Sequence, residues 1–353
     1  DGSFTIDFIQ SSQQYYLDKT GNILSPQDIL IIRSANDLKR FRDSVNSGNS
    51  FSRKYVYLTN DITLDIDEEW EPIGTYFNDN TVITAESNIP FSGSFDGKGH
   101  EINGLKITSS EKGKGLFGLT NNAIIENLGI GSNCNITNVG NCSGSIVGYS
   151  YNSTTIKNCY NKSNVSGIGQ QIGGIAGQNC PNSIIINSYN LGSIQTQSSS
   201  VGGITGNNAG TIQNCYNSGT ISSTLDSAGG ICGLLSGIIE NCYNTNAITA
   251  TSNYSGGIAG MIYFTDAKIV NSYSIGSVIS SNPSHGIAGG IAQGTVENSY
   301  YLENSINGSN TSYFVGIFMK SSSELVELAP TLGSAFKPDL DNINNGYPIL
   351  YWQ

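Results

Sequence analysis

The chain has 353 residues, of which 43 are glycine and 41 are asparagine, whereas only 12% are charged. Its 16 Lys and Arg residues against 27 Asp and Glu residues give a formal net charge of −11, which excludes the basic footprint of a nucleic-acid-binding protein. No apolar run approaches the ~18 residues that a membrane-spanning helix needs, so we expect no membrane insertion by this segment. A hydrophobic share of 37% is too high for a disordered chain.

The N-terminal flank predicts one helix, over 34–48. Ser34 and Asp37 form a capping pair, and Gly48 can end the helix. Its apolar stripe consists of Leu38, Phe41 and Val45. Short strands are predicted after it, at 55–58, 62–64, 91–95, 101–107 and 116–117. We assign these strands to the first, less regular coils of a larger repeat structure.

An acidic segment follows the second of these strands. On an extended chain, the alternate residues Asp65, Asp67 and Glu69 would point the same way and could ligate Ca²⁺. The alternative is a solvated acidic loop before Trp70. Weak calcium binding is therefore a hypothesis, and no other cofactor is expected. Farther along, the string from Asp96 to His100 contains two glycines and indicates a tight turn rather than an acid/base pair.

A short string, Gly-Ile-x-Gly or a close variant, then recurs along the chain. Its copies begin at Gly115, Ser145, Gly174, Gly203, Gly230, Gly257 and Gly290, the last of which ends in Gln rather than Gly. Successive copies are 30, 29, 29, 27, 27 and 33 residues apart. A second string, Ile-x-Asn-Cys/Ser-Tyr, follows each copy from Ser145 onward, and a β-branched residue follows most of its Asn residues by seven positions. Two sequence strings that recur together with nearly the same spacing indicate a structural repeat.

Each unit predicts three short strands separated by Gly, Asn or Ser turns, with no helical spacing of apolar residues. Helical repeats are therefore excluded, and the unit fits one coil of a parallel β-helix whose coils stack ~4.8 Å apart. Stacking explains the columns of identical residues, which run from Ile146 to Ile291 and from Ile156 to Val296. We expect the Asn column to adopt left-handed turns and to form hydrogen bonds from coil to coil.

The tyrosine column is the main candidate ligand-binding feature. It consists of Tyr160, Tyr189, Tyr216, Tyr243, Tyr273 and Tyr300. If these rings face outward, they could form an aromatic platform for sugars or for the apolar face of a partner. If they lie at a corner or face inward, they are packing residues.

The cysteine count is odd, at seven. Cys159, Cys215 and Cys242 share one position of the repeat, where other coils carry serine. Exchange with serine favours free, buried thiols, although a disulfide between the consecutive coils of Cys215 and Cys242 is geometrically conceivable.

At the C-terminal end, a short helix is predicted at 323–328, followed by an aromatic strand at 345–352 that could close the bottom of the β-helix. The predicted organisation is one continuous solenoid. It has an N-terminal cap at 1–54, irregular coils at 55–118, regular coils at 119–305 and a C-terminal cap at 306–353.

The chain resembles extracellular bacterial proteins that carry the GLUG repeat, which is found in adhesin-like proteins and beside IgA-specific metallopeptidases. The resemblance covers roughly residues 30–353 and includes Trp70-Glu71-Pro72-Ile73-Gly74, Phe91-Ser92-Gly93-Ser94-Phe95-Asp96-Gly97-Lys98-Gly99-His100, the Gly-Leu-Phe-Gly at 115–118 and the closing Gly346-Tyr347-Pro348-Ile349-Leu350. It implies a right-handed β-helix, in agreement with the crossover rule. The His-Glu-x-x-His motif of the peptidase relatives is missing, so the resemblance implies no peptidase activity.

The favoured interpretation is a non-catalytic module for adhesion or interaction, located outside the cell or on the bacterial surface. Its expected partner is a glycan or a surface protein from a host or the environment. Between residues 141 and 300 only seven residues are charged, which argues against an enzyme. The alternatives are a glycan-binding or polysaccharide-degrading β-helix and a passive spacer that presents other domains of a larger chain.

Overall fold

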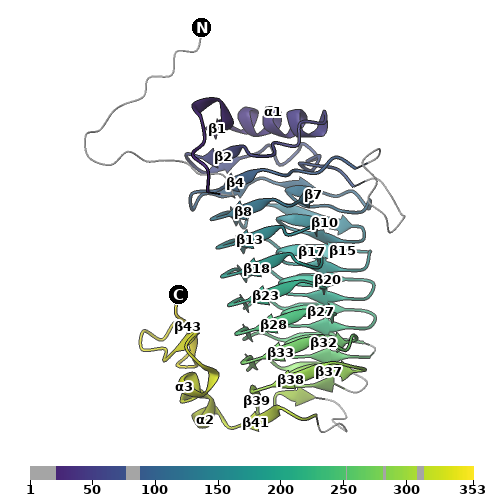
Figure 1. Ribbon diagram of the computed structural model, residues 1–353. Helices are drawn as coiled ribbons and strands as arrows, with labels where there is room; N and C mark the ends of the chain where they lie inside the picture. The colour runs from purple at the N-terminus through teal and green to yellow at the C-terminus, as the bar shows by residue number, and fades with distance from the viewer. Residues whose placement is uncertain (1–20, 77–87, 252, 281–283, 308–313) are drawn as a thin grey trace, which may run out of the picture.

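The computed structural model describes residues 21–76, 88–251, 253–280, 284–307 and 314–353. These residues form an elongated stack of coils with a helix across its N-terminal end (Figure 1). Every sheet within the stack is parallel, and each strand pairs with the strand of the next coil. The predicted fold class, an all-β parallel β-helix, is confirmed. None of the helices in these ranges is both long and apolar enough to span a membrane.

Five parallel sheets run along the stack, and a regular coil crosses them in the order 1, 2, 3, 4, 5. Sheet 1 contains β1 (Ile29–Ile32), β2 (Tyr55–Leu58), β4 (Ser94–Asp96), β8 (Ile124–Glu126), β13 (Thr155–Lys157), β18 (Ile184–Ile186), β23 (Thr211–Gln213), β28 (Ile238–Glu240), β33 (Lys268–Val270) and β38 (Thr295–Glu297). Sheet 2 contains β3 (Ile62–Thr63), β5 (Glu101–Asn103), β9 (Gly129–Ile130), β14 (Tyr160–Asn161), β19 (Tyr189–Asn190), β24 (Tyr216–Asn217), β29 (Tyr243–Asn244), β34 (Tyr273–Ser274), β39 (Ser299–Leu302) and β41 (Ile317–Lys320).

The other three sheets close the coil. Sheet 3 contains β6 (Lys106–Ile107), β10 (Asn135–Val139), β15 (Val165–Gly167), β20 (Ile194–Thr196), β25 (Ile221–Ser223), β30 (Ile248–Ala250), β35 (Val278–Ser280) and β40 (Ile306–Asn307). Sheet 4 contains β11 (Ser143–Gly144), β16 (Ile172–Gly173), β21 (Val201–Gly202), β26 (Ala228–Gly229), β31 (Ser255–Gly256) and β36 (Ser284–His285). Sheet 5 contains β7 (Phe117–Asn121), β12 (Val147–Tyr151), β17 (Ala176–Asn179), β22 (Thr205–Asn208), β27 (Cys232–Leu235), β32 (Ala259–Ile262) and β37 (Ala288–Ile291).

The prediction of three strands per coil was too low. The Gly-Ile-x-Gly string spans a bend rather than one strand, because Ile175 lies between β16 and β17 and is fully buried. A two-residue strand such as β16 is also too short to show alternation in the sequence.

The last copy of the repeat was placed wrongly. Ala259 pairs with Ala288, so the copy that stacks on Gly257-Ile258-Ala259-Gly260 is Gly286-Ile287-Ala288-Gly289, and the spacing is 29 residues rather than 33. Ile287 is fully buried in the core, whereas Ile291 is only partly buried. The two copies are adjacent and differ in a single residue, Gly289 against Gln293, so that only strand pairing and burial distinguish them.

The predicted N-terminal helix is confirmed. Helix α1 spans Ala35–Asn46, and the Ser34 side chain accepts a hydrogen bond from the Asp37 backbone N–H. Its buried residues are Leu38, Phe41 and Val45, as the apolar stripe predicted. The helix lies across the first strands of sheet 1 and covers that end of the core (Figure 1).

The asparagine column forms the expected turns and hydrogen bonds, which we call the outer asparagine ladder. Its members, Asn158, Asn187, Asn214, Asn241, Asn271 and Asn298, have φ values of 54°, 50°, 52°, 53°, 48° and 45°. Each side-chain amide donates to the side-chain oxygen of the Asn one coil closer to the N-terminus, with distances between 2.7 and 3.4 Å. Asparagine tolerates this left-handed backbone, and the ladder satisfies its amide at each coil.

A second column, the inner asparagine ladder, was not predicted. It consists of Asn161, Asn190, Asn217 and Asn244, all fully buried. The first three amides each donate to the oxygen of the next Asn toward the C-terminus at 2.8 Å, and that of Asn244 donates to the Ser274 hydroxyl at 3.3 Å. Each of the four also donates to a backbone carbonyl two residues ahead in its own coil. The Tyr-Asn pair that recurs in the sequence was the available signal for this ladder.

All seven cysteines are free thiols, and six of them are buried. The prediction of free thiols is therefore confirmed, including at the stacked pair Cys215 and Cys242. Burial raises the pKa of Cys159 and Cys232 to about 12 and that of Cys180 to about 11.

We expect the folded protein to resist thiol reagents at neutral pH, because the attacking species is the thiolate and burial disfavours it. Cys134, which is only half-buried, should react first. Alkylation with iodoacetamide followed by mass spectrometry measures this order, and all seven thiols should react after denaturation. Rapid labelling of Cys159 in the folded protein would contradict the prediction.

Candidate functional site

The tyrosine column lies on the outside of sheet 2, and we call it the tyrosine ladder. Its members pair in register, from Tyr160 through Tyr189, Tyr216, Tyr243 and Tyr273 to Tyr300. The flanking residues of the first rung, Cys159 and Asn161, are fully buried. Because side chains alternate along a strand, the tyrosine between them points outward.

The rings of the ladder stack on one another. Centroids of neighbouring rings from Tyr160 to Tyr273 are 4.9 to 5.1 Å apart, and their planes differ by 2° to 13°. Parallel rings this close overlap in an offset stack. The faces of the rings therefore cover one another, and the surface offered to a partner consists of ring edges and hydroxyl groups. A flat platform for stacking sugars would require exposed ring faces.

The C-terminal arm, residues 321–353, covers the lower half of the ladder. It contains α2 (Ser322–Val326), α3 (Ala329–Leu332) and the antiparallel pair β42 (Phe336–Lys337) and β43 (Ile349–Leu350). Apolar residues of the arm form a cluster of their own with Tyr243, Tyr273 and Tyr300, which are 1%, 0% and 7% exposed. Figure 1 shows the arm beside the stack. The terminal strand was predicted to close the bottom of the β-helix, and the structure places it along the side instead.

Hydrogen bonds hold the arm against the ladder. The Tyr243 hydroxyl donates to Oε1 of Gln353 at 2.9 Å, and the Tyr273 hydroxyl donates to the Pro348 carbonyl. At the tip of the arm, the indole of Trp352 donates to the Asn214 carbonyl at 3.0 Å. This ring lies 6.0 Å from Tyr189 and 5.8 Å from Tyr216, so the arm ends beside these two rungs.

A group of charged residues lies at the other end of the ladder, which we call the charged end. Tyr160 donates from its hydroxyl to Oε1 of Glu101 at 2.9 Å, and Lys162 donates to the same oxygen at 2.6 Å. The rung between Tyr160 and Glu101 is Gly129, where an added Cβ would lie 2.3 Å from the Tyr160 ring. Glycine at this rung therefore allows the ring to extend toward Glu101.

Two carboxylates of this end remain ionised at neutral pH. The hydrogen bond from Lys162 lowers the pKa of Glu101, and the backbone N–H of Glu101 lowers the pKa of Asp61. Cleavage of a glycosidic bond needs one protonated carboxyl group to donate to the leaving oxygen. Neither Glu101 nor Asp61 is held in that protonated form.

We expect alkaline pH to release the arm. Burial raises the pKa of Tyr243 and Tyr273 well above the ordinary value of 10, because the phenolate is disfavoured beneath the arm. In the released state both groups ionise near ~10. The stabilisation from arm docking is therefore complete below pH 10 and is lost as the pH rises through the raised pKa values. Tyrosinate absorbance at 295 nm, followed with Trp352 fluorescence, measures the transition. A single normal titration of all 19 tyrosines would contradict it.

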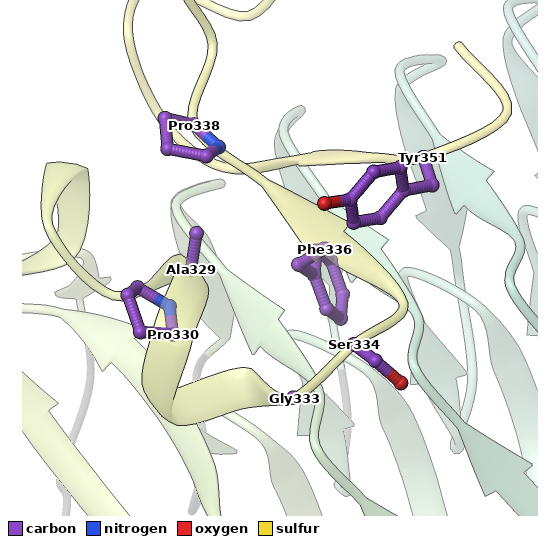
Figure 2. Close-up of a pocket in the computed structure, with 7 residues that line it drawn as sticks. All are labelled: Ala329, Pro330, Gly333, Ser334, Phe336, Pro338 and Tyr351. Carbon is purple, nitrogen blue, oxygen red and sulfur yellow. The ribbon is translucent and has the colours of Figure 1, made fainter.

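The arm also carries a cavity of about 540 Å³ on its own surface (Figure 2). Its lining consists of Ala329, Pro330, Gly333, Ser334, Phe336, Pro338 and Tyr351. The polar side chains of this lining are one serine and one tyrosine hydroxyl, so these residues provide neither a carboxylate nor a base for catalysis. Phe336 contacts Tyr273 of the ladder, with ring centroids 5.9 Å apart, which places this part of the arm against the covered rungs.

The acidic segment does not form the extended chain that the calcium hypothesis required. Residues 66 and 67 lie in a turn, and the Asp65 side chain accepts from the Asp67 backbone N–H at 3.0 Å. Glu69 is engaged elsewhere, because its carboxylate accepts from the backbone N–H and the hydroxyl of Thr108. Within the described ranges, no three His, Cys, Asp or Glu side chains are grouped so that they could hold a metal ion.

We expect added Ca²⁺ to leave the melting temperature unchanged, since Asp65, Asp67 and Glu69 do not converge on one point. Differential scanning fluorimetry with CaCl₂, and with MgCl₂ as an ionic-strength control, tests this. An upward shift that is specific for calcium and lost in Asp67→Asn would restore the hypothesis.

Comparison with known proteins supports the fold and the repeat. A profile of the GLUG motif matches residues 197–222, which is about one coil. A crystal structure described as "a putative immunoglobulin A1 protease" from Bacteroides ovatus is similar, with a TM-score of 0.53 and 22% sequence identity. The alignment covers 95% of this chain and 94% of that chain. At this identity the likeness shows the fold alone. No curated protein matches the sequence.

Proposed function

We propose that this GLUG-repeat β-helix is a non-catalytic interaction module, displayed outside a bacterial cell as part of a larger protein. The GLUG match and the fold shared with the Bacteroides ovatus protein support an extracellular type of repeat module. Its partner in this proposal is a glycan or a surface protein from a host or the environment.

The observation that carries the proposal is the outward tyrosine ladder. The ladder is rigid, because each ring is fixed by its neighbours and by a strand of sheet 2. Its lower rungs already bind a polypeptide, namely the arm, through apolar contacts and tyrosine hydroxyls. Tyr160, Tyr189 and Tyr216 are only partly buried, and they extend the same surface beyond the arm. Tyrosine is enriched at binding surfaces because it combines a large apolar ring with a polar tip.

Glycan binding is a second candidate, which one observation favours. Asp61 and Glu101 are ionised acceptors at the end of the ladder, and ionised carboxylates are strong acceptors for sugar hydroxyls. A glycan would therefore bind at the charged end, beside Tyr160, through hydrogen bonds rather than by stacking on the rings.

Retention assays with the whole chain test the proposal. Immobilised wild-type protein is screened against arrays of polysaccharides and purified extracellular surface proteins, beside Tyr189→Ala and Tyr160→Ala. Ile279→Ala is a matched control, because Ile279 is 40% exposed on sheet 3, a different sheet from that of the ladder. We expect a partner that the control retains and the tyrosine variants lose.

The other outcomes would overturn the proposal. Release of shortened glycan products would indicate an enzyme, and a complete lack of retention would indicate a passive spacer. Retention that is equal in all variants would place the binding surface away from the ladder.

A further inference from the structure

One coil presents four apolar side chains on the outside of the β-helix, two on each side of the turn at Asn187, next to the tip of the arm. We call Ile184, Ile186, Tyr189 and Leu191 the apolar row. Ile184 is 38% exposed and Leu191 is 42% exposed, while Ile186 and Tyr189 are partly buried. Trp352 contacts Tyr189 and extends the row toward the arm.

Neighbouring coils carry polar residues at the same positions. The preceding coil has Thr155, Lys157, Tyr160 and Lys162, and the following coil has Thr211, Gln213, Tyr216 and Ser218. Both lysines are paired, Lys157 with Glu126 at 2.8 Å and Lys162 with Glu101 at 2.6 Å. The row is therefore a small apolar centre with a polar rim, which is the usual anatomy of a protein-binding surface.

The arm shows what binds to such a surface on this protein. Farther down the ladder, Ile275 and Leu302 take the column position that Leu191 takes in its coil. Both pack against the cluster that includes the arm residues Leu325, Leu332 and Leu350. Ser218 and Thr245 lie between Leu191 and Ile275 in this column, so the row joins the existing interface through Tyr216 and Trp352, which pack against the same cluster.

We propose that the apolar row, together with Trp352, binds an apolar segment of a partner polypeptide in continuation of the arm; this assignment rests on the proposed function. The segment carries aliphatic or aromatic side chains that cover Ile184 and Leu191, and its backbone carbonyls accept from the Tyr189 hydroxyl. A glycan fits this row poorly, because three of its four side chains offer no hydrogen bond and buried sugar hydroxyls would be left without partners.

A peptide library displayed on phage tests the assignment against the full-length protein. Random 12-residue peptides are selected on immobilised wild-type chain, and the enriched peptides are measured in solution by fluorescence polarisation. We expect peptides rich in Leu, Ile, Phe and Trp, and at least tenfold weaker binding to Ile184→Thr and Leu191→Ser.

These two variants place in the row the residues that the next coil uses at the same positions, Thr211 and Ser218, so the fold tolerates them. Circular dichroism confirms folding. Leu225→Ser is the matched control, since Leu225 is 47% exposed and lies between β25 and β26, outside the row. We expect it to bind the peptides as the wild type does.

Three results would overturn the assignment. They are the absence of enriched peptides, equal binding by wild type and Leu191→Ser, and a concentration-dependent dimer in sedimentation that Leu191→Ser abolishes. The last result would assign the row to a second copy of the chain. If only an arrayed glycan is retained, and Tyr189→Ala or Tyr160→Ala loses it, the polypeptide assignment fails while the proposed interaction function stands. If neither the peptide library nor the arrays yield a binder, both the peptide assignment and the proposed interaction function fail.

Discussion

Replacing Asn190 by alanine is expected to lower the free energy of unfolding by about 2 to 4 kcal/mol, because it removes a fully buried amide from the middle of the inner asparagine ladder. Its amide donates to the Gly192 carbonyl at 2.7 Å and to Asn217 at 2.8 Å, and its oxygen accepts from Asn161 at 2.8 Å. The substitution leaves the Gly192 carbonyl and one donor of Asn161 without these partners in an interior that excludes water, and it leaves a void as well.

Urea denaturation followed by circular dichroism measures the loss. Gln195→Ala is the matched control, since Gln195 is exposed on β20 of the same coil. We expect it to change stability by no more than about 0.5 kcal/mol. Equal midpoints for the two variants would show that the buried amides contribute little to stability. Because repeat proteins can unfold locally, hydrogen exchange in the coils on either side should show whether the loss stays local.

The second large effect is expected at Tyr273, where substitution by alanine should detach the C-terminal arm. The ring is fully buried and stacks on Tyr243 with centroids 5.1 Å apart. Its hydroxyl accepts from the Asn344 side chain at 2.8 Å and donates to the Pro348 carbonyl. Removing a buried aromatic ring costs about 3 to 5 kcal/mol, and most of that loss falls on the arm.

Hydrogen exchange detected by mass spectrometry distinguishes release of the arm from general unfolding. In Tyr273→Ala we expect fast exchange over residues 322–350 and unchanged protection in β13 and β18. Tyr160→Ala is the control, because Tyr160 is a ladder rung that the arm cluster does not include. Normal protection of the arm in Tyr273→Ala would show that Tyr243 and Tyr300 suffice to hold it.

The sequence predicted the features that repeat. The buried isoleucines and the left-handed outer asparagines each follow from one residue type at one position of the repeat, whereas helix α1 follows from its cap and its apolar stripe. The number of sheets could not be read in this way, because strands of two or three residues show no alternation and a buried bend such as Ile175 resembles part of a strand. The copy at Gly286 was missed for a related reason, since only strand pairing and burial distinguish it from the copy at Gly290.

The arm could not be placed from the sequence because its docking surface repeats. Leu325, Leu328 and Leu332 are apolar residues of the arm, and the ladder offers a tyrosine ring at each of six rungs. What fixes the position is the tether, since β41 pairs with β39 at the last coil and the arm begins immediately after β41. The edge-on exposure of the rings was equally hidden, because spacing along the chain gives the rung but not the tilt of a ring.

Equivalence of the coils has a genetic consequence. Between the coils of Asn190, Asn217 and Asn244, both asparagine ladders and the tyrosine ladder repeat the same contact, so loss or duplication of one of these coils by recombination would rejoin all three without a mismatch. The length of the module can thus drift by units of ~4.8 Å while each joint stays intact. The arm is anchored at the last coil and Glu101 at an early one. Copy number therefore sets the distance along the stack between Trp352 and Glu101, and related chains that differ by one coil should differ in the number of tyrosine rungs that the arm leaves uncovered.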